Sequence, residues 1–252
     1  RGIILGFHIG RNLQYLMRSK SIDFFINYNK KPPELRMFKW NGFPLYYRTA
    51  TSDVDLINVI LFRSRSEYHI DTKGISPKII LDIGGNIGLS AIYFAIKFPN
   101  ANIYSLEPQR DNFELLLKNT AHYKNIKAFN IGLGNRDAVL PIYNDNDTNN
   151  GTFSLYTGNK ERGYVQIRNA ATFFQENITD VDLIKIDTEG AEYDILTSIP
   201  QKILQKTSWI IGELHNNRDK ELIDYLSEWF KVTTSAPIPC PACDFLAINH
   251  NL

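Results

Sequence analysis

The segment KIILDIGGNIGLSAIYFAIKFP, residues 78–99, decides the fold. Its first six residues, 78–83, form a short apolar run that is typical of a strand buried on both faces of a sheet. A glycine-rich turn follows, and residues 89–98 have the composition of a helix that Pro99 ends. A buried strand that turns sharply into a helix is the opening unit of a parallel α/β sheet.

The same alternation of strand and helix continues toward the C-terminus. We predict strands at 101–106, 126–131, 181–187 and 209–214, and helices at 110–123, 189–199 and 220–230. A turn-rich stretch contains an expected hairpin around residues 135–137, and residues 232–235 and 245–249 form a closing antiparallel pair. This order predicts a mostly parallel, seven-stranded sheet with helices on both faces.

The N-terminal part has a different texture. Residues 1–30 show broad helical periodicity, and Asn41-Gly42 between two aromatic-rich runs predicts a hairpin, because both residues accept positive φ. Ser52 or Asp53 is expected to cap a short helix that runs to about Phe62.

The composition bounds the class of protein. The 252 residues suffice for an accessory segment, residues 1–70, and one ligand-binding domain, residues 71–252. The 28 basic and 27 acidic side chains leave a formal net charge of +1, which argues against a nucleic-acid partner held by bulk electrostatics. No apolar run approaches the roughly 20 residues of a membrane span, and we predict a cytoplasmic protein.

Cys240 and Cys243 are the two cysteines of the chain. A C-x-x-C pair can be redox-active or half of a zinc site, but there is no second pair, and prolines flank this one. We therefore predict two loop cysteines in a reducing compartment.

The glycine-rich turn carries the first functional signal. Glycines at 84, 85 and 88 do not match the dinucleotide fingerprint G-x-G-x-x-G, although they let the backbone approach a ligand closely. Asp82, at the strand end before the turn, would repel a pyrophosphate. It suits the cationic end of a ligand, directly or through water.

Glu107 ends the next predicted strand. An acid at this position can accept both hydrogen bonds of a ribose diol, in dinucleotide-binding and other nucleoside-binding sheets alike. The alternative is that Glu107 only stabilises the helix that begins at Pro108.

Two later strand ends carry further polar residues. The stretch DLIKIDTEGAE, residues 182–192, delivers Asp187, Glu189 and Glu192 around a carboxyl end, and GELHN, residues 212–216, places His215 at the next one. Ligands bind outside such ends. The alternatives are that Glu189 and Glu192 only stabilise a helix start and that His215 is structural.

Several of these stretches together resemble the FkbM family of S-adenosylmethionine-dependent methyltransferases. The similar pieces are RTATSDVDLINVIL at 48–61, LDIGGNIGLSAIYFA at 81–95, SLEPQRDNFELLLKN at 105–119, GTFSL at 151–155, LIKIDTEGAEYDIL at 183–196 and GELH at 212–215. Gly85 departs from the alanine expected there. The resemblance implies a Rossmann-like class I methyltransferase fold and O-methylation of hydroxyls on sugars, polyketides or other secondary products.

The resemblance also assigns residues to the cofactor, S-adenosylmethionine. It implies cofactor contacts for Asp82, Gly84, Asn86, Gly88 and Glu107, with Asn130 and Ile131 near the adenine. Asp187 would lie close to the methionine end or to the acceptor, a small-molecule or glycan hydroxyl.

For the chemistry we predict an in-line displacement at the methyl carbon. His215 titrates near neutral pH and would take the hydroxyl proton, with Asp187 or Glu189 orienting it or the acceptor. In a metal-assisted alternative, Asp187, Glu213 and Asn216 would hold Mg²⁺. We predict no metal, because alternation along the strand would turn Glu213 away.

Two other classes of protein remain as alternatives. An NAD-type oxidoreductase is disfavoured by the missing fingerprint and by Asp82, and a non-catalytic nucleoside-binding module would bind cofactor without turnover. The acceptor pocket is expected to include Trp40, Phe43, Tyr46 and Tyr47, with the loop 148–156.

Overall fold

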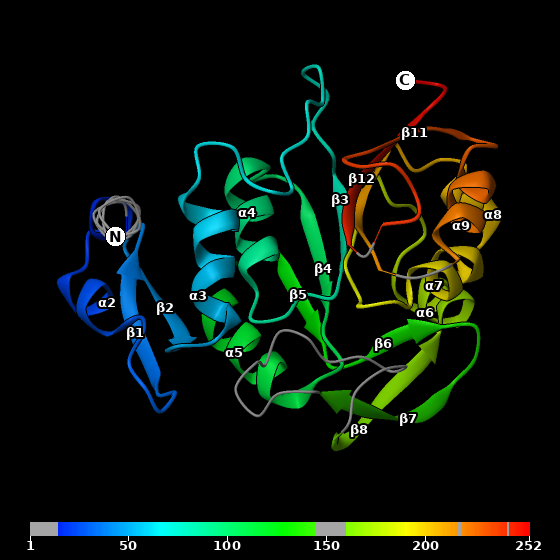
Figure 1. Cartoon of the computed structure of the whole chain (residues 1–252). Helices are drawn as coiled ribbons and strands as arrows, with labels where there is room; N and C mark the ends of the chain where they lie inside the picture. The colour runs from blue at the N-terminus through cyan, green and yellow to red at the C-terminus, as the bar shows by residue number, and fades with distance from the viewer. Residues whose placement is uncertain (1–14, 145–159, 216–217, 241) are drawn as a thin grey trace.

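The computed structural model describes residues 15–144, 160–215, 218–240 and 242–252 (Figure 1). The predictions made for residues 1–14, for the loop 148–156 and for Asn216 lie outside the described residues.

The main sheet has seven strands in the order β11-β12-β10-β9-β3-β4-β5. The strands are β3 (Ile79–Ile83), β4 (Asn102–Leu106), β5 (Ile126–Phe129), β9 (Leu183–Ile186), β10 (Trp209–Leu214), β11 (Phe230–Thr234) and β12 (Cys243–Asn249). Neighbours from β5 to β10 pair in parallel, and β12 is antiparallel to both β10 and β11. The predicted parallel sheet and its closing antiparallel pair are confirmed.

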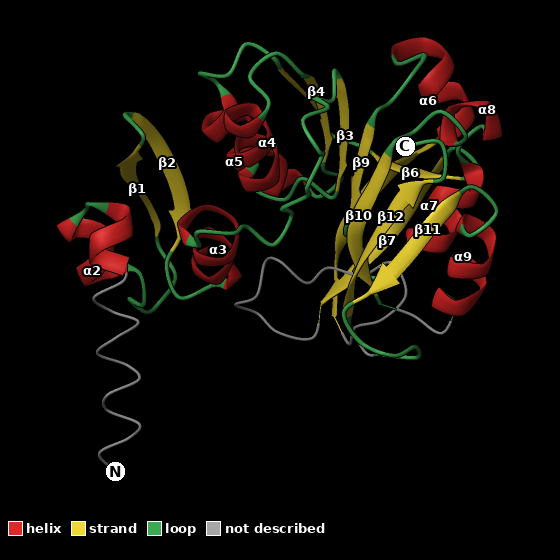
Figure 2. Cartoon of the chain, turned by 90° about the horizontal axis from the view of Figure 1, so that it is seen from above, coloured by secondary structure: helices red, strands yellow, loops and turns green. Residues whose placement is uncertain are grey.

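Helices cover both faces of this sheet (Figures 1 and 2). One face carries α4 (Leu89–Lys97) and α5 (Arg110–Thr120), and the other carries α6 (Ala170–Asn177), α7 (Glu192–Ser198), α8 (Gln201–Leu204) and α9 (Asp219–Leu226). Each face has its own apolar cluster, because the strands point alternate side chains to opposite sides. The α/β class is therefore as predicted.

The N-terminal segment packs on the α4 side. Residues 15–19 are helical, followed by α2 (Ile22–Asn27), the hairpin strands β1 (Leu35–Trp40) and β2 (Phe43–Arg48), and α3 (Ser52–Leu56). The hairpin turns at Asn41-Gly42 with φ of 49° and 86°, as predicted. Its buried rings share one apolar cluster with residues of β3 and α4.

The predicted helix cap was wrong. Thr51 caps α3, since its hydroxyl accepts a hydrogen bond from the backbone N–H of Asp53. The Asp53 carboxylate binds the guanidinium of Arg48 instead, with Nε 2.8 Å from Oδ2. From residue 57 to Phe62 the helix continues in the wider π form.

A second, three-stranded sheet has the order β6-β8-β7. Its strands are β6 (Gly132–Gly134), β7 (Ala138–Asn144) and β8 (Lys160–Asn169). The hairpin predicted around 135–137 is wrong: Gly132 and Ala138 both pair with Ile167, from opposite sides of β8. The turn instead binds the end of β8, where the Asn169 N–H donates to Asp137 Oδ1 at 2.7 Å.

Cys240 and Cys243 form a disulfide at the start of β12. The prediction of free thiols was wrong, because the loop brings the two α-carbons to 6.1 Å, within the range that a disulfide spans. No helix among the described residues is both long enough and apolar enough to cross a membrane.

Candidate active site

A cavity of about 300 Å³ opens at the carboxyl ends of β3, β4, β9 and β10. This is the edge at which open α/β sheets bind ligands, and the volume is at the lower end for a ligand pocket. Its walls include the loop Ile83–Asn86, the β4 end at Leu106–Gln109 and the β9 and β10 ends with Asp187, Glu189 and Glu213. N-terminal residues such as Leu56, Ile60 and Tyr68 and residues of the second sheet, among them Leu133 and Ile167, also line it.

The glycine loop lies directly on the end of β9. A Cβ built on Gly84 would lie 1.9 Å from the carbonyl oxygen of Asp187, and the φ of Gly84 is +81°. The N–H groups of Gly84 and Gly85 both donate to the Leu106 carbonyl, at 3.0 and 2.9 Å. Gly88, also predicted as a cofactor residue, caps α4 and packs toward α5 rather than lining the cavity.

Gly85 departs from the expected alanine for a visible reason. A Cβ at Gly85 would lie 2.2 Å from the hydroxyl oxygen of Ser105. That hydroxyl donates to Asp82 Oδ2 at 2.6 Å. The Ser105 hydroxyl thus occupies the space that an alanine methyl would need.

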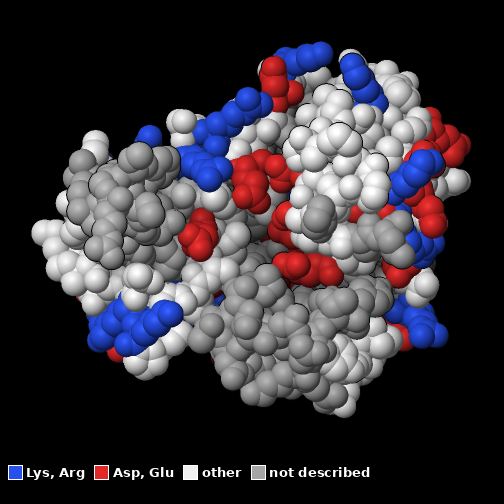
Figure 3. Space-filling view, viewed as in Figure 1, with Lys and Arg blue, Asp and Glu red and all other residues white. Residues whose placement is uncertain are grey.

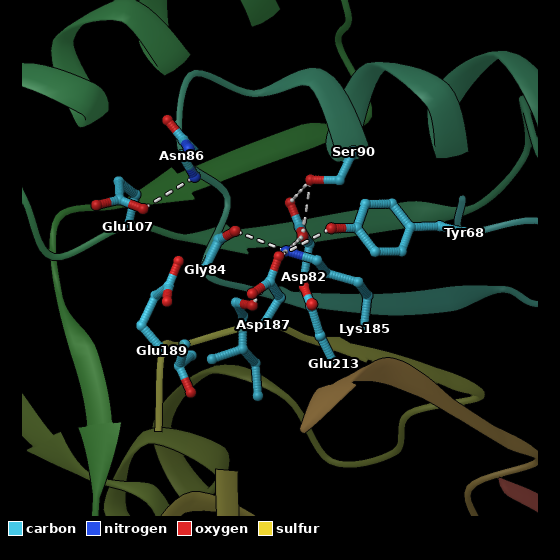
Figure 4. A network of polar contacts seen from close by, with 12 residues as sticks. Tyr68, Asp82, Gly84, Asn86, Ser90, Glu107, Lys185, Asp187, Glu189 and Glu213 are labelled. Carbon is cyan, nitrogen blue, oxygen red and sulfur yellow. Dashed lines mark hydrogen bonds and ion pairs between the residues drawn. The ribbon is translucent and has the colours of Figure 1, made fainter. Parts of the chain in front are cut away.

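Asp82 lies beneath the cavity and is fully buried. It accepts hydrogen bonds from Ser90 and Ser105, and Lys185 Nζ lies 3.6 Å from its Oδ1. Lys185 in turn donates to the Gly84 carbonyl at 2.7 Å (Figure 4). Asp82 and Lys185 thus neutralise each other's buried charges, and Lys185 links β9 to the glycine loop.

Glu107 faces the cavity from the end of β4. Its two carboxylate oxygens accept hydrogen bonds from the N–H groups of Asn86 and Gln109, both at 2.9 Å. Burial raises the pKa of Glu107 to about 7, although these backbone hydrogen bonds oppose the shift. Ile131 lines the cavity, whereas the Asn130 amide braces the Glu107 and Pro108 carbonyls at 2.9 Å.

The three predicted catalytic residues lie together at the ends of β9 and β10. His215 Nε2 is 3.9 Å from Asp187 Oδ1, 4.0 Å from Glu189 Oε2 and 3.5 Å from Glu213 Oε2. His215 Nδ1 lies 3.2 Å from Oε1 of the buried Glu192. That same oxygen accepts from the backbone N–H and the hydroxyl of Thr188, which ties the loop after β9 to α7.

These groups shift one another's protonation. Burial lowers the pKa of His215, but hydrogen bonding to Glu192 and Glu213 and the charge of Asp187 outweigh it and raise the pKa to about 11. Burial and the neighbouring Asp187 raise the pKa of Glu189 to about 7. For Glu192 burial acts upward, but the hydrogen bond to His215 prevails and lowers the pKa. His215 is therefore cationic at neutral pH in this arrangement.

Glu213 was predicted to point away from the site, and this was wrong. β9 ends at Ile186, which pairs with Gly212, so Glu213 extends past the end of its neighbour. Its carboxylate lines the cavity together with Asp187 (Figure 4). One oxygen of Glu213, one of Asp187 and one nitrogen of His215 all lie within 4.8 Å of one another, a set that could hold a metal ion.

Sequence reasoning missed Tyr68. Its hydroxyl donates to Asp187 Oδ2 at 3.0 Å, and Lys185 Nζ lies 5.0 Å from the centre of its ring. The residue comes from outside every stretch that carried a functional signal, so only its tertiary position reveals it.

The aromatic side chains predicted for the acceptor pocket are elsewhere. Neither Trp40, Phe43, Tyr46 nor Tyr47 lines the cavity. Tyr47 is fully buried in the core, and Phe43 stacks on His122 with ring centres 5.0 Å apart. The N-terminal segment instead contributes the aliphatic side chains of Leu56 and Ile60, together with Ser52, Glu67 and Tyr68.

The parallel strands are closed by β12, which lies antiparallel between β10 and β11, and the cavity at their carboxyl ends has an acid at the β4 tip. This arrangement is that of a class I methyltransferase domain. The profile of the methyltransferase FkbM domain matches residues 82–232, and the chain belongs to this family. S-adenosylmethionine is the cofactor of this class of domain. The residues at the cavity fit this cofactor, because the backbone of the glycine loop is open to a ligand and the carboxylate of Glu107 can accept hydrogen bonds from a ribose diol.

Curated relatives include Methyltransferase 1 of Beauveria bassiana, 26% identical in an alignment of 162 residues that covers 55% of this chain and 65% of that protein. The hexuronic acid methyltransferase AglP of Haloferax volcanii is 25% identical over 60% of this chain and 62% of its own. The match to the antimetabolite synthetase AmbE of Pseudomonas aeruginosa covers 8% of that protein. The chain thus spans less than two thirds of each of these relatives. Among solved structures, the fibrillarin pre-rRNA processing protein of Methanococcus jannaschii is 14% identical with a TM-score of 0.46, over 87% of this chain and 84% of that one.

Proposed function

We propose that the protein transfers a methyl group from S-adenosylmethionine to a hydroxyl oxygen of a small molecule or glycan. The observation that carries the proposal is Glu107, which faces the cavity from the tip of β4 beside a glycine loop that lacks the dinucleotide fingerprint G-x-G-x-x-G. Family membership supports methyl transfer, and the hexuronic acid methyltransferase among the relatives supports a sugar-type acceptor.

The cofactor would lie against the loop Gly84–Asn86, with its ribose hydroxyls at Glu107 and its adenine toward Ile131. It supplies a methyl group already activated on a sulfonium. The chain's own task is to hold that group in line with the acceptor oxygen, and such alignment contributes up to roughly 7–11 kcal/mol in favourable cases. Asp82 supports the loop through Lys185 and its neighbours.

The acceptor hydroxyl must lose its proton. Asp187 and Glu189 line the cavity, whereas His215 stands behind them with Nε2 about equally far from both carboxylates. We therefore propose that the carboxylate of Asp187 or Glu189 accepts the hydroxyl proton as the general base. His215 would hold these carboxylates in position. A general base of this kind contributes about 10²–10⁴-fold in rate.

The test of the cofactor is isothermal titration of the purified chain with S-adenosylhomocysteine and, separately, with NADH. We expect binding of S-adenosylhomocysteine alone, abolished by Glu107→Ala and retained by Glu114→Ala, which removes an exposed glutamate of α5. Binding of NADH alone would overturn the proposal in favour of an oxidoreductase.

The test of the acceptor is transfer of radiolabelled methyl from S-adenosylmethionine to a panel of uronic acids, neutral sugars and hydroxylated ring compounds. We expect label in one class of acceptor, and we expect it to survive mild base, because a methyl ether is stable there whereas a methyl ester is hydrolysed. Cofactor binding without transfer to any hydroxyl in the panel, by the wild-type chain, would argue for a binding module instead.

A further inference from the structure

The donor atoms of Asp187, Glu213 and His215 converge from two neighbouring strands. Two ligands of one ion lie about 3 Å apart when at right angles and about 4.2 Å apart when opposite, for metal–ligand distances of about 2.1 Å. Nε2 of His215 is 3.5 Å from Glu213 Oε2 and 3.9 Å from Asp187 Oδ1, and the whole set lies within 4.8 Å. Small side-chain rotations would bring all three onto one ion.

A buried glutamate holds the histidine from behind. Glu192 is fully buried, and its Oε1 lies 3.2 Å from His215 Nδ1, so the Nδ1–H points at this carboxylate. Nε2 faces the carboxylates of Asp187, Glu189 and Glu213. A carboxylate behind an imidazole in this way is the usual support of a metal-binding histidine. The second oxygen of Glu192 is buried and finds no hydrogen-bond partner among the described residues.

Acidic side chains gather around the imidazole ring of His215. The carboxylates of Asp187, Glu189, Glu192 and Glu213 all have an oxygen within 4.0 Å of the His215 ring nitrogens. Lys185 Nζ lies 4.0 Å from Asp187 Oδ2 and 3.6 Å from Asp82 Oδ1, so this one lysine is shared by two carboxylates. The acidic side chains gather in the hollow at the centre of the face shown in Figure 3. Such an excess of negative charge favours an added cation.

From this geometry we propose that Asp187, Glu213 and His215 bind a divalent metal ion, with Glu192 as the supporting residue. Two carboxylates and one imidazole suit an ion of the Mn²⁺ type, which accepts both oxygen and nitrogen ligands. Metal and proton compete for Nε2 of His215, since ligands bind metals in their deprotonated form.

The site has a clear place in the molecule. Asp187 and Glu213 line the cavity, so an ion between them would be open on the side of the bound acceptor. An ion there could contact the acceptor hydroxyl and lower its pKa. The metal site concerns the same cavity as the proposed methyl transfer, but its existence does not depend on which acceptor is methylated.

The experiment is a titration of the full chain, stripped with EDTA and dialysed, with MnCl₂ followed by the loss of the free Mn²⁺ electron paramagnetic resonance signal. We expect one bound ion per chain. Glu213→Gln should weaken the affinity at least about tenfold, because it removes a charged ligand. Asp244→Asn is the matched control: it removes one negative charge from the residue paired with Glu213 in β12, but no ligand, and should change the affinity less than about threefold.

Two results would overturn the metal site. One is no Mn²⁺ bound by the wild-type chain at free concentrations on the order of 1 mM, the weak end for functional sites. The other is equal weakening by Glu213→Gln and Asp244→Asn, which would show a diffuse attraction of cations, as for a cationic acceptor, rather than coordination. Binding of S-adenosylhomocysteine, measured on the same metal-free samples, tests the proposed function separately, and circular dichroism checks that both variants fold.

Discussion

At the scale of single residues, function depends on which side chains the strand ends bring to one edge. Glu107, Asp187, Glu189 and His215 could be predicted because each follows an apolar run, and a parallel sheet collects the carboxyl ends of its strands. Tyr68 could not, because its contact with Asp187 depends on how the N-terminal segment packs.

The raised pKa of Glu107 predicts how cofactor binding depends on pH. A carboxyl with a pKa of about 7 is mostly neutral at pH 6 and mostly ionised at pH 8. The ionised form is the better acceptor for a ribose diol, so S-adenosylhomocysteine should bind about tenfold more weakly at pH 6 than at pH 8. Calorimetry at both pH values measures this.

Glu107→Gln is the control for that experiment. The variant should bind more weakly than wild type at pH 8, with a dissociation constant that stays level between pH 6 and pH 8. A pH dependence unchanged by the substitution would assign the titration to another group.

Removal of the Tyr68 hydroxyl tests whether Asp187 must be held in place. Tyr68→Phe keeps the ring over Lys185 but deletes the 3.0 Å hydrogen bond to Asp187. A hydrogen bond to a charged group contributes about 1.5–3 kcal/mol, so kcat should fall about tenfold or more. The affinity for S-adenosylhomocysteine should change little. Equal losses in kcat and in cofactor affinity would place Tyr68 in cofactor binding instead.

At the scale of elements, apolar runs predicted the buried strands well. β3, β4 and β10 lie within one or two residues of their predicted bounds, because a strand buried on both faces leaves a continuous apolar signature. β8 was missed, since residues 160–169 are mostly polar and pair in a small outer sheet. The short helix α6 that follows it was missed as well. The hairpin around 135–137 failed for the same reason: its partner strand was missing from the prediction.

The glycine loop allows a matched test of close approach between elements. Gly84 and Gly42 have nearly the same positive φ, +81° and +86°, but only Gly84 faces backbone, 1.9 Å from the Asp187 carbonyl. Gly42→Ala should cost about 1–2 kcal/mol from the backbone conformation alone. Gly84→Ala should cost clearly more, about 4 kcal/mol or above, and abolish binding of S-adenosylhomocysteine. Urea unfolding measures the free energy of unfolding of both variants. Equal losses would mean that the glycine loop can shift away from β9 and make room for the added methyl group.

At the scale of the whole molecule, many contacts join the accessory segment, residues 1–70, to the sheet domain, residues 71–252. The division predicted near residue 70 gave no sign of them. Arg48 binds the buried Asp53 and also Asn112 of α5, at 2.7 Å. Asn119 of α5 bonds the backbone of Tyr46 in both directions, at 2.7 and 3.0 Å. The two parts also form one apolar cluster. The boundary was placed where the apolar pattern of the sequence changes. That pattern reflects local secondary structure, so it could not show how the two parts pack.

These contacts predict that the chain unfolds as one cooperative unit. Backbone amides of the hairpin β1–β2 and of β3 and β4 should therefore reach the same limiting protection in native-state hydrogen exchange. Asp53→Ala leaves the Arg48 guanidinium without its buried partner and should cost about 3–5 kcal/mol. Because the parts are coupled, this loss should appear equally in the amides of the hairpin and of the central strands. If hairpin amides exchange far faster than those of β3, and the substitution affects the hairpin alone, then the segment is a separate unit that docks on the domain.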